Sequence, residues 1–148
     1  MQPQNFNKEH DHSLLFEGNR RLRTLVENLP GIVFRCKNDK DWTMQFISKE
    51  CLWITGYSPE DFCAPDKITW ASIIHPLDRE NVWNIIQKSV KQKEKFHLTY
   101  RILDSEQKIH WVNEMGIAVQ NKKGTIFLEG YIQDITEQIT GGKINIIR

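Results

Sequence analysis

The chain has 148 residues, and its 20 Lys and Arg against 19 Asp and Glu leave a formal net charge of +1. That length suits one domain, and the near-neutral charge argues against a dedicated nucleic-acid binder, whose phosphate contacts need a basic surplus. With 26% charged and 39% hydrophobic residues, the composition is globular rather than disordered, and no apolar run approaches the roughly 18 residues of a membrane span.

The chain begins with a polar tail followed by a helical pattern. Residues 1–12 are rich in Gln, Asn, His and charge, which favours a flexible tail. Over residues 13–29, Leu15, Leu22 and Leu29 recur every seven residues, which predicts an amphipathic helix that the next residue, a proline, ends. A helix docked on its own domain and a seam with a partner helix both fit this pattern.

Two short strands and several helices are predicted next. Residues 31–37 and 42–48 flank a polar turn at hairpin spacing. Residues 50–55 predict a short helix that Gly56 ends with a left-handed cap. Pro59 then stands at the first position of the following helix. This punctuation predicts a middle section of short helices.

Two further caps are visible in this section. Ser58 and Asp61 have the spacing of a capping box, because each can satisfy a free backbone donor of the other. Asp78 is the expected N-cap of the longest helix, which runs to about Lys91. The buried stripe of that helix is expected to hold Val82, Trp83, Ile86 and Val90, with Ile85 beside it.

Three longer strands close the chain. Residues 95–103, 109–119 and 125–135 alternate apolar and polar side chains with a period of two. The alternation of the second strand directs Asn113 inward beside Trp111, where its amide needs a partner. The order of helix, two strands, several helices and three strands predicts an α+β domain on an antiparallel sheet. The second strand is expected to present Ile109, Trp111, Met115, Ile117 and Val119 on one face.

The last strand ends on Asp134-Ile135-Thr136. A carboxylate there can hold a basic side chain and fix how the chain leaves the sheet, and Thr136 can N-cap a following helix. Simple strand termination by polar residues is the plainer alternative. Residues 139–148 contain a glycine pair that breaks any continuous helix, so they form a separate C-terminal exit segment.

The sequence contains no recognisable set of catalytic or metal-binding residues. It contains no paired acid–base carboxylates, no phosphate-binding glycine loop and no nucleophile elbow, so we expect no enzyme activity and no metal site. His97 and His110 are expected at the surface. The three cysteines lack C-x-x-C spacing and no signal peptide is visible, which predicts buried free thiols in the cytoplasm. These are Cys36, Cys51 and Cys63.

Several local motifs share their order and spacing with one known family. They are Leu29-Pro30-Gly31, the run TGYSPEDF from Thr55 to Phe62, the run IHPLDR from Ile74 to Arg79, Tyr100-Arg101, Trp111, Gly130 and Asp134-Ile135-Thr136-Glu137. Together they resemble the PAS family, the small sensory domains of signalling proteins, over about residues 22–138. The resemblance places the PAS domain itself at residues 30–138.

The resemblance implies a five-stranded antiparallel sheet in the order 2-1-5-4-3, with helices on one face and an N-terminal amphipathic helix. Between sheet and helices some members hold haem, flavin or a metabolite. Haem binding needs a histidine on the long helix, which residues 78–91 lack, and the cysteine motif of flavin photosensors is absent. No cofactor is therefore predicted, although an unidentified small molecule stays possible.

A pocket between sheet and helices would be lined by large flat side chains with polar edges. Such side chains suit an organic ligand or a filled core equally, and the close packing of protein interiors favours the filled core. The candidate pocket residues are Phe34, Phe46, Trp53, Tyr57, Trp70, Trp83, Tyr100, Trp111, Asn113 and Met115.

The function expected from the resemblance is that of a cytoplasmic sensory module from a bacterial signalling protein. It would form a homodimer and relay a signal, through Asp134-Ile135-Thr136, to an attached histidine kinase or diguanylate cyclase. The alternative is a receptor with a metabolite in the pocket. The expected dimer face comprises Leu15, Leu22, Leu25, Val112, Phe127 and Tyr131.

Overall fold

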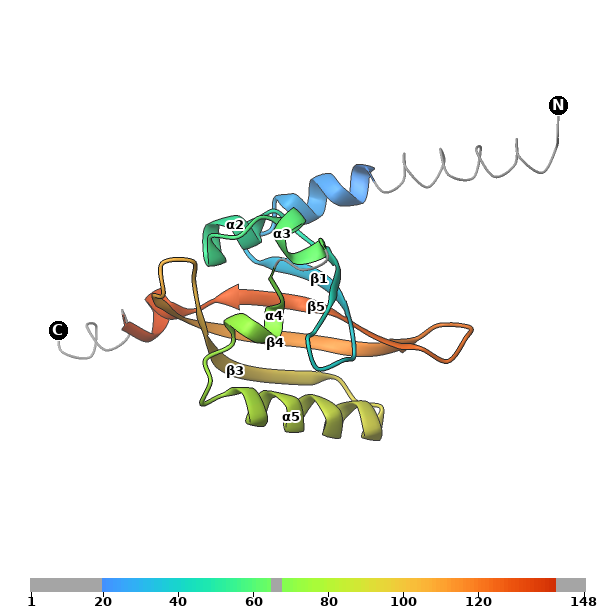
Figure 1. The fold of residues 1–148 in the computed structure, drawn as a ribbon. Coiled ribbons are helices and arrows are strands. Elements are labelled where there is room, and N and C mark those ends of the chain that lie inside the picture. The colour runs from blue at the N-terminus through green and yellow to red at the C-terminus, as the bar shows by residue number, and fades with distance from the viewer. Residues whose placement is uncertain (1–19, 65–67, 141–148) are drawn as a thin grey trace, which may run out of the picture.

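The computed structural model describes residues 20–64 and 68–140 of the chain. Five strands form one antiparallel sheet with the spatial order β2-β1-β5-β4-β3 (Figure 1). This order and pairing confirm the α+β fold class expected from the sequence. The strands are β1 (Ile32–Lys37), β2 (Met44–Ile47), β3 (Phe96–Leu103), β4 (Ile109–Gln120) and β5 (Ile126–Asp134).

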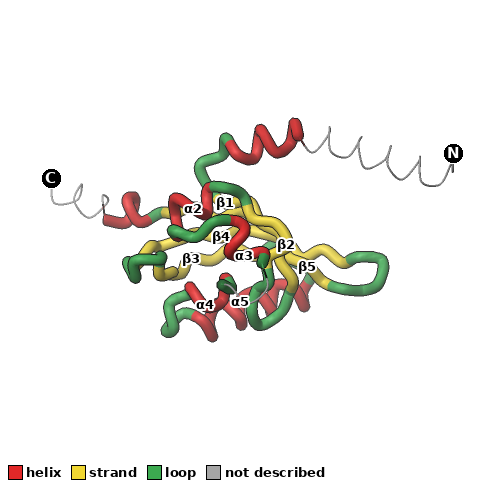
Figure 2. Tube along the Cα trace, turned by 45° about the horizontal axis from the view of Figure 1, so that its top comes forward, coloured by secondary structure: helices red, strands yellow, loops and turns green. Residues whose placement is uncertain are grey.

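Helices pack over one face of the sheet, and the opposite face carries no helix from the central part of the chain (Figure 2). They are α2 (Glu50–Thr55), α3 (Pro59–Cys63), α4 (Trp70–Ile73) and α5 (Arg79–Gln92). The face of β3 towards the helices buries Phe96, Leu98, Tyr100 and Ile102, as the alternation of this strand predicts. From α5 the buried side chains are Val82 and Ile86. Burial of such side chains stabilises the fold by about 1.5–3 kcal/mol each.

The short helices begin and end where the sequence predicts. Gly56 has φ 82° and ends α2, with its N–H donating to the carbonyl of Leu52. Ser58 and Asp61 form both hydrogen bonds of the capping box at the start of α3. The chain therefore turns sharply between two helices without leaving their ends unpaired.

Asp78 stands at the N-cap position of α5, as predicted, but its side chain makes no cap hydrogen bond. It accepts instead from Arg101 on β3, from the backbone N–H at 2.9 Å, from Nε at 2.9 Å and from Nη2 at 2.7 Å. The hydrogen bonds from Arg101 hold the pKa of Asp78 below its usual value against the opposing effect of burial. The carboxylate thus ties the start of α5 to the edge strand.

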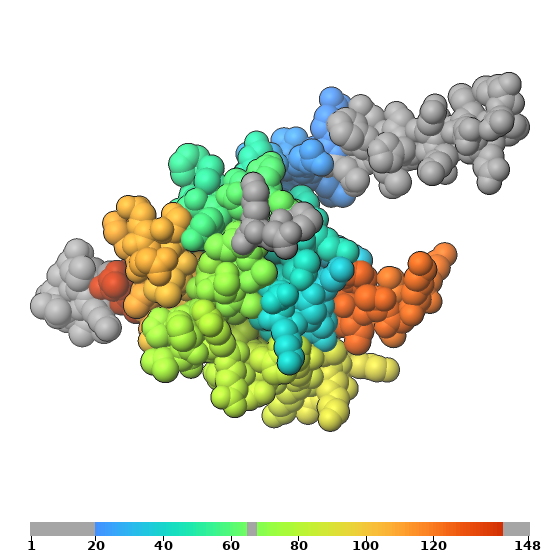
Figure 3. All heavy atoms as spheres, in the orientation of Figure 1, coloured from blue at the N-terminus to red at the C-terminus, as the bar shows by residue number. Residues whose placement is uncertain are grey.

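Residues 20–27 are helical and stand at the rim of the domain (Figures 1 and 3). Leu22 and Leu25 are 60% and 65% exposed, so the apolar side of this helix is not buried on its own domain. An ion pair of 3.0 Å between Glu27 and Lys49 joins it to the start of α2. Residues 13–19 of the predicted helix, Leu15 included, lie outside the described residues, as do the tail and the last eight residues, and the helix ends at Glu27 rather than at Leu29.

The cysteines are free thiols, and two of the three are buried. Cys36 on β1 and Cys51 on α2 lie in the core, where burial raises the pKa of both thiols, that of Cys51 to about 12. Cys63 is exposed, so the prediction of a buried thiol is wrong there. It is the last residue of α3 and directly follows the buried Phe62, so it points to a different side of the helix.

Candidate functional site

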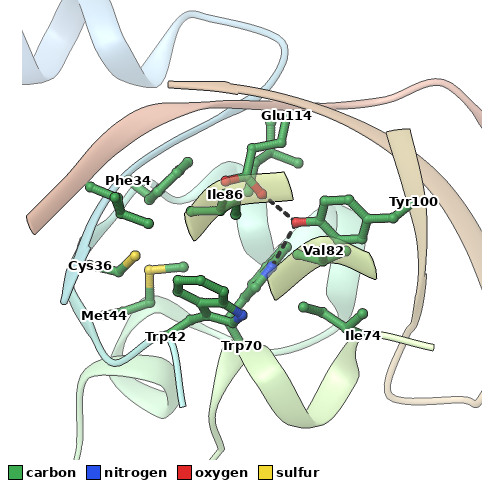
Figure 4. A pocket seen from close by; sticks show the side chains of 12 residues that line it. Phe34, Cys36, Trp42, Met44, Trp70, Ile74, Val82, Ile86, Tyr100 and Glu114 are labelled. Atoms are coloured by element: carbon green, nitrogen blue, oxygen red, sulfur yellow. Dashed lines mark hydrogen bonds between the residues drawn. The ribbon is translucent and has the colours of Figure 1, made fainter. Parts of the chain in front are cut away.

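The described residues between the sheet and the helices enclose a small cavity of about 10 Å³ (Figure 4). That volume accommodates about one water molecule and lies far below the roughly 300–1,000 Å³ of ligand pockets. Of the predicted pocket residues, Phe34, Trp70 and Tyr100 line it. In this structure the interior is therefore a filled core, and the cavity marks a polar spot within it.

That polar spot is a chain of three buried side chains from three elements. The indole Nε1–H of Trp70 on α4 donates to the Tyr100 hydroxyl at 2.9 Å, and this hydroxyl donates to Glu114 Oε1 at 2.5 Å. The three residues are between 2% and 4% exposed, and Figure 4 shows them converging on the cavity. The chain connects a covering helix to the two strands β3 and β4.

Burial shifts the pKa values of the two acidic groups in this hydrogen-bonded chain, Tyr100 and Glu114. It raises the pKa of Glu114 from 4.5 to about 7, although the hydrogen bond from Tyr100 opposes the change. Burial, followed by the charge of Glu114, raises the pKa of Tyr100 well above 10. Below neutral pH the Glu114 carboxyl is therefore protonated in the folded state.

Glu114 was not singled out from the sequence, because the inner face of β4 was assigned to the wrong residues. Trp111, Asn113 and Met115 lie on the outer face, whereas Val112 and Glu114 are buried on the inner face. A period of two shows which residues share a face but not which face is inside. The period of two itself is present along β4, as predicted.

The predicted inward orientation of Asn113 is accordingly wrong. Its Oδ1 lies 2.7 Å from Nε2 of His97 and accepts from the Thr99 hydroxyl at 3.3 Å, and both partners are exposed residues of β3. The amide thus finds its partner on the neighbouring strand rather than in a pocket.

Four other candidate pocket residues lie away from the cavity. Tyr57 packs edge-on against Phe62, with ring centroids 5.9 Å apart, and Trp83 packs against Trp42 at 5.1 Å. Phe46 is 39% exposed and Trp53 is 77% exposed. The aromatic residues therefore do not form a single pocket.

Two residues of the predicted dimer face are buried. Val112 is fully buried in the core and cannot contact a partner. Phe127 lies on the outer face beneath the guanidinium of Arg35, whose central carbon is 4.3 Å from the ring centroid, and the residue is only 7% exposed. Tyr131 lies on the same outer face, half-buried, opposite Met115 of β4.

The exit motif is fastened to β4 by several hydrogen bonds. Asp134 Oδ1 accepts from the backbone N–H of Thr136 at 2.9 Å and from its hydroxyl at 2.6 Å. That hydroxyl oxygen accepts from the Trp111 N–H at 2.8 Å, and the Ile135 N–H donates to the Trp111 carbonyl at 2.8 Å. Thr136 is the first residue of the helix at 136–140 rather than its N-cap, and its side chain binds β4. The prediction that Thr136 caps this helix is therefore wrong.

The Asp134 carboxylate does hold a basic side chain, as its position suggested. Its Oδ2 lies 2.7 Å from Nδ1 of His110, whose Nε2 lies 2.7 Å from Asp104 Oδ2. His110 is half-buried on the inner side of β4, so the surface position expected for it is wrong. The sequence signal for this pairing is absent because it depends on the register between β4 and β5.

The described residues also lack membrane-spanning and metal-binding features. No helix in that part of the chain is both long and apolar enough to cross a bilayer. Within the same residues, no three His, Cys, Asp or Glu side chains gather as metal ligands.

A family model described as PAS fold matches residues 45–132, more than half of the chain. The chain belongs to the PAS family, whose domains are sensory modules. This agrees with the strand order and with the resemblance carried by the sequence motifs.

A curated relative and two solved structures extend the comparison. The chain is 30% identical over 119 residues to the methyl sulfide methyltransferase-associated sensor of Methanosarcina acetivorans, covering 79% of the chain and only 12% of that sensor. It resembles the N-terminal domain of a diguanylate cyclase with a PAS/PAC sensor from Marinobacter aquaeolei, with a TM-score of 0.60, 20% identity and coverage of 73% of this chain and 97% of the other. A sensory box histidine kinase/response regulator from Burkholderia thailandensis matches with a TM-score of 0.64, 23% identity and coverage of 86% and 93%.

Proposed function

We propose that this chain is a non-catalytic PAS module that forms a homodimer through the outer face of its sheet and relays a signal to an attached output domain. The observation that carries the proposal is the apolar character of the sheet face that α2 to α5 leave uncovered. On β4 alone, Ile109, Met115 and Ile117 are 45%, 42% and 44% exposed. Contiguous exposed apolar side chains mark interaction surfaces.

The helix at residues 20–27 adds a second exposed apolar surface. Leu22 and Leu25 are more than half exposed, and no part of the described domain covers them. A second copy of the chain is the partner we propose for both surfaces, because a homodimer buries the same apolar patch twice.

The relay would run from the outer face to the exit. Trp111 belongs to the outer face, and both its backbone N–H and its carbonyl bind the exit, through Thr136 and Ile135. A partner that displaces this part of β4 would therefore also displace the start of the helix at 136–140. We assign Asp134, Ile135 and Thr136 to signal exit on this basis.

The nature of the output domain is the part of the proposal taken from relatives. The chain spans about an eighth of the Methanosarcina acetivorans sensor, and the two solved structures come from a diguanylate cyclase and a histidine kinase. We propose an output domain of one of these two kinds. The cytoplasmic location, the bacterial origin and the division at residues 13–29, 30–138 and 139–148 stay predictions.

A metabolite receptor is the second candidate function. The buried carboxyl of Glu114 beside the cavity is what favours it, because such a group could hold a hydrogen-bond donor of a ligand. The cavity of about 10 Å³ admits no metabolite unless core side chains move. We therefore rank this function below the dimeric relay.

Sedimentation velocity tests the dimer. We expect the unaltered chain and Leu77→Glu to sediment as dimers and Ile117→Glu as a monomer, since a buried unpaired charge is costly at an interface. Leu77 is a matched control because it is 78% exposed and lies before α5, on the helix side of the domain. A monomeric unaltered chain, or an Ile117→Glu dimer of the same strength, would contradict the proposal.

A further inference from the structure

His110 joins two segments that are distant in the sequence. Asp104 belongs to the turn between β3 and β4, and Asp134 ends β5. The ring contacts one carboxylate oxygen of each, both at 2.7 Å, through different nitrogens. The imidazole therefore bridges the β3–β4 turn and the signal exit.

The chemistry of the two partners fixes the charge of the ring. An ionised carboxylate only accepts hydrogen bonds, so both ring nitrogens must carry a proton for both contacts to form. The bridge is thus an imidazolium between two carboxylates. Burial lowers the pKa of His110, but the hydrogen bonds to Asp104 and Asp134 outweigh it and raise the pKa above 6.5.

Each carboxylate has already committed its other oxygen. Asp104 Oδ1 accepts from the backbone N–H groups of Glu106 and Lys108, and Asp134 Oδ1 accepts from Thr136. The Oδ2 atoms of both carboxylates hydrogen-bond to the ring of His110. Loss of one ring proton therefore leaves one Oδ2 facing a nitrogen lone pair.

We propose that His110 is a proton-dependent clasp, which fastens the exit segment to the β3–β4 turn while the ring is doubly protonated and frees one of them when a proton passes to solvent. The inference rests on the proposed function only in giving the exit a signalling role. The clasp would make the relay from the outer face to the exit depend on pH as well as on the binding of a partner.

Other charged groups around the ring are few. The neighbouring position on β3 is Ile102, which is apolar and fully buried. The last turn of α2, which reaches the β3–β4 turn through the carbonyl of Thr55, carries no charged side chain. Glu106, Lys108 and Glu137 are exposed to solvent. Asp104 and Asp134 are the charges that act on the ring pKa.

The sign of the effect follows from the raised pKa. While Asp104 and Asp134 are ionised, the stability that the clasp contributes is fully present below about pH 6.5, where the ring is protonated in the folded and unfolded chain alike. It is lost as the pH rises through the pKa of the folded state. The exit should accordingly be held at pH values below the folded-state pKa of the ring and loosened above it.

NMR titration of the 148-residue chain tests the clasp. We expect the His110 ring carbon Cε1 to titrate with a midpoint above 6.5 and the Thr136 amide to shift with the same midpoint. His110→Gln should abolish the Thr136 shift. His97→Gln, which removes a histidine of the outer face, should leave it unchanged. Asp104→Asn should lower the His110 midpoint, because it removes one of the two carboxylates.

A His110 midpoint at or below 6.5, or a Thr136 shift that survives in His110→Gln, would overturn the inference. A folded spectrum for each variant is the condition for reading the titration. The dimer is measured separately by sedimentation. A monomer with an intact titration would contradict the proposed function alone, and a dimer without the titration would contradict the clasp alone.

Discussion

Tyr100 and Glu114 share a hydrogen bond of 2.5 Å inside the core, although they are not directly paired across β3 and β4. In the register of the sheet Tyr100 lies opposite Val112, and Glu114 lies opposite Leu98. The diagonal contact lets the phenol also accept from Trp70 on α4. One hydroxyl therefore connects two neighbouring strands to a covering helix.

The buried carboxyl should make stability depend on pH. Below pH 4.5 the Glu114 carboxyl is protonated in both the folded and the unfolded chain. Between pH 4.5 and about 7 it ionises only in the unfolded chain, so the free energy of unfolding falls as the pH rises. This interval corresponds to about 3 kcal/mol. Glu114→Gln removes the effect, so its free energy of unfolding relative to the unaltered chain should rise by about this amount from pH 4.5 to 8. Urea unfolding at several pH values measures it, and parallel pH curves would contradict it.

Removing the shared hydroxyl should be costly. Tyr100→Phe leaves the Trp70 indole N–H and the Glu114 carboxyl without this partner in the core, and each buried unpaired group costs about 1–3 kcal/mol. We expect a loss of about 2–4 kcal/mol in urea unfolding. Tyr131→Phe, on the half-buried outer face, is the matched control and should change stability by less than about 0.5 kcal/mol. Equal losses for the two variants would show that the chain of hydrogen bonds contributes nothing.

Gly130 allows β5 to pass close to its neighbours. A Cβ at this position would lie 2.3 Å from the Met115 carbonyl oxygen and 3.0 Å from both Gly116 Cα and a ring carbon of Phe34. Since backbone must shift to accommodate it, Gly130→Ala should cost at least about 2 kcal/mol. Gly124→Ala, in the β4–β5 turn with φ 86° and no contact nearer than 3.5 Å, should cost about 1 kcal/mol. Thermal unfolding ranks the two, and the reverse order would refute the packing argument.

The capping box at α3 gives a smaller effect. Ser58→Ala removes the hydrogen bond from the Asp61 N–H, and loss of such a cap costs about 1 kcal/mol. Ser58→Thr retains an acceptor at the same position and should restore most of that stability. Urea unfolding compares them, and no difference between Ala and Thr would mean that the cap is not stabilising.

Local features of the fold were accessible from the sequence because they depend on neighbouring residues. Gly56 and the Ser58–Asp61 box each act within one helical turn, and the alternation of β3 runs along a single strand. The PAS motifs supplied the strand order, which no local pattern contains. These predictions hold in the structure.

The candidate site was less accessible because it depends on register between distant segments. The large side chains of β4, Trp111 and Met115 among them, lie on the outer face, whereas the inner face holds Glu114 and the small Gly116. Large apolar residues usually point inward, so the reversal supports the proposal that a partner covers the outer face. The contact of His110 with Asp134 spans 24 positions and likewise has no local signature.

Native mass spectrometry of the 148-residue chain, compared with its mass after denaturation, tests the central claim most directly. The dimeric relay predicts an intact mass equal to twice that of the denatured chain, because the cavity of about 10 Å³ has no room for a metabolite. A monomer that carries a small molecule lost on denaturation would contradict this account. It would favour the receptor instead.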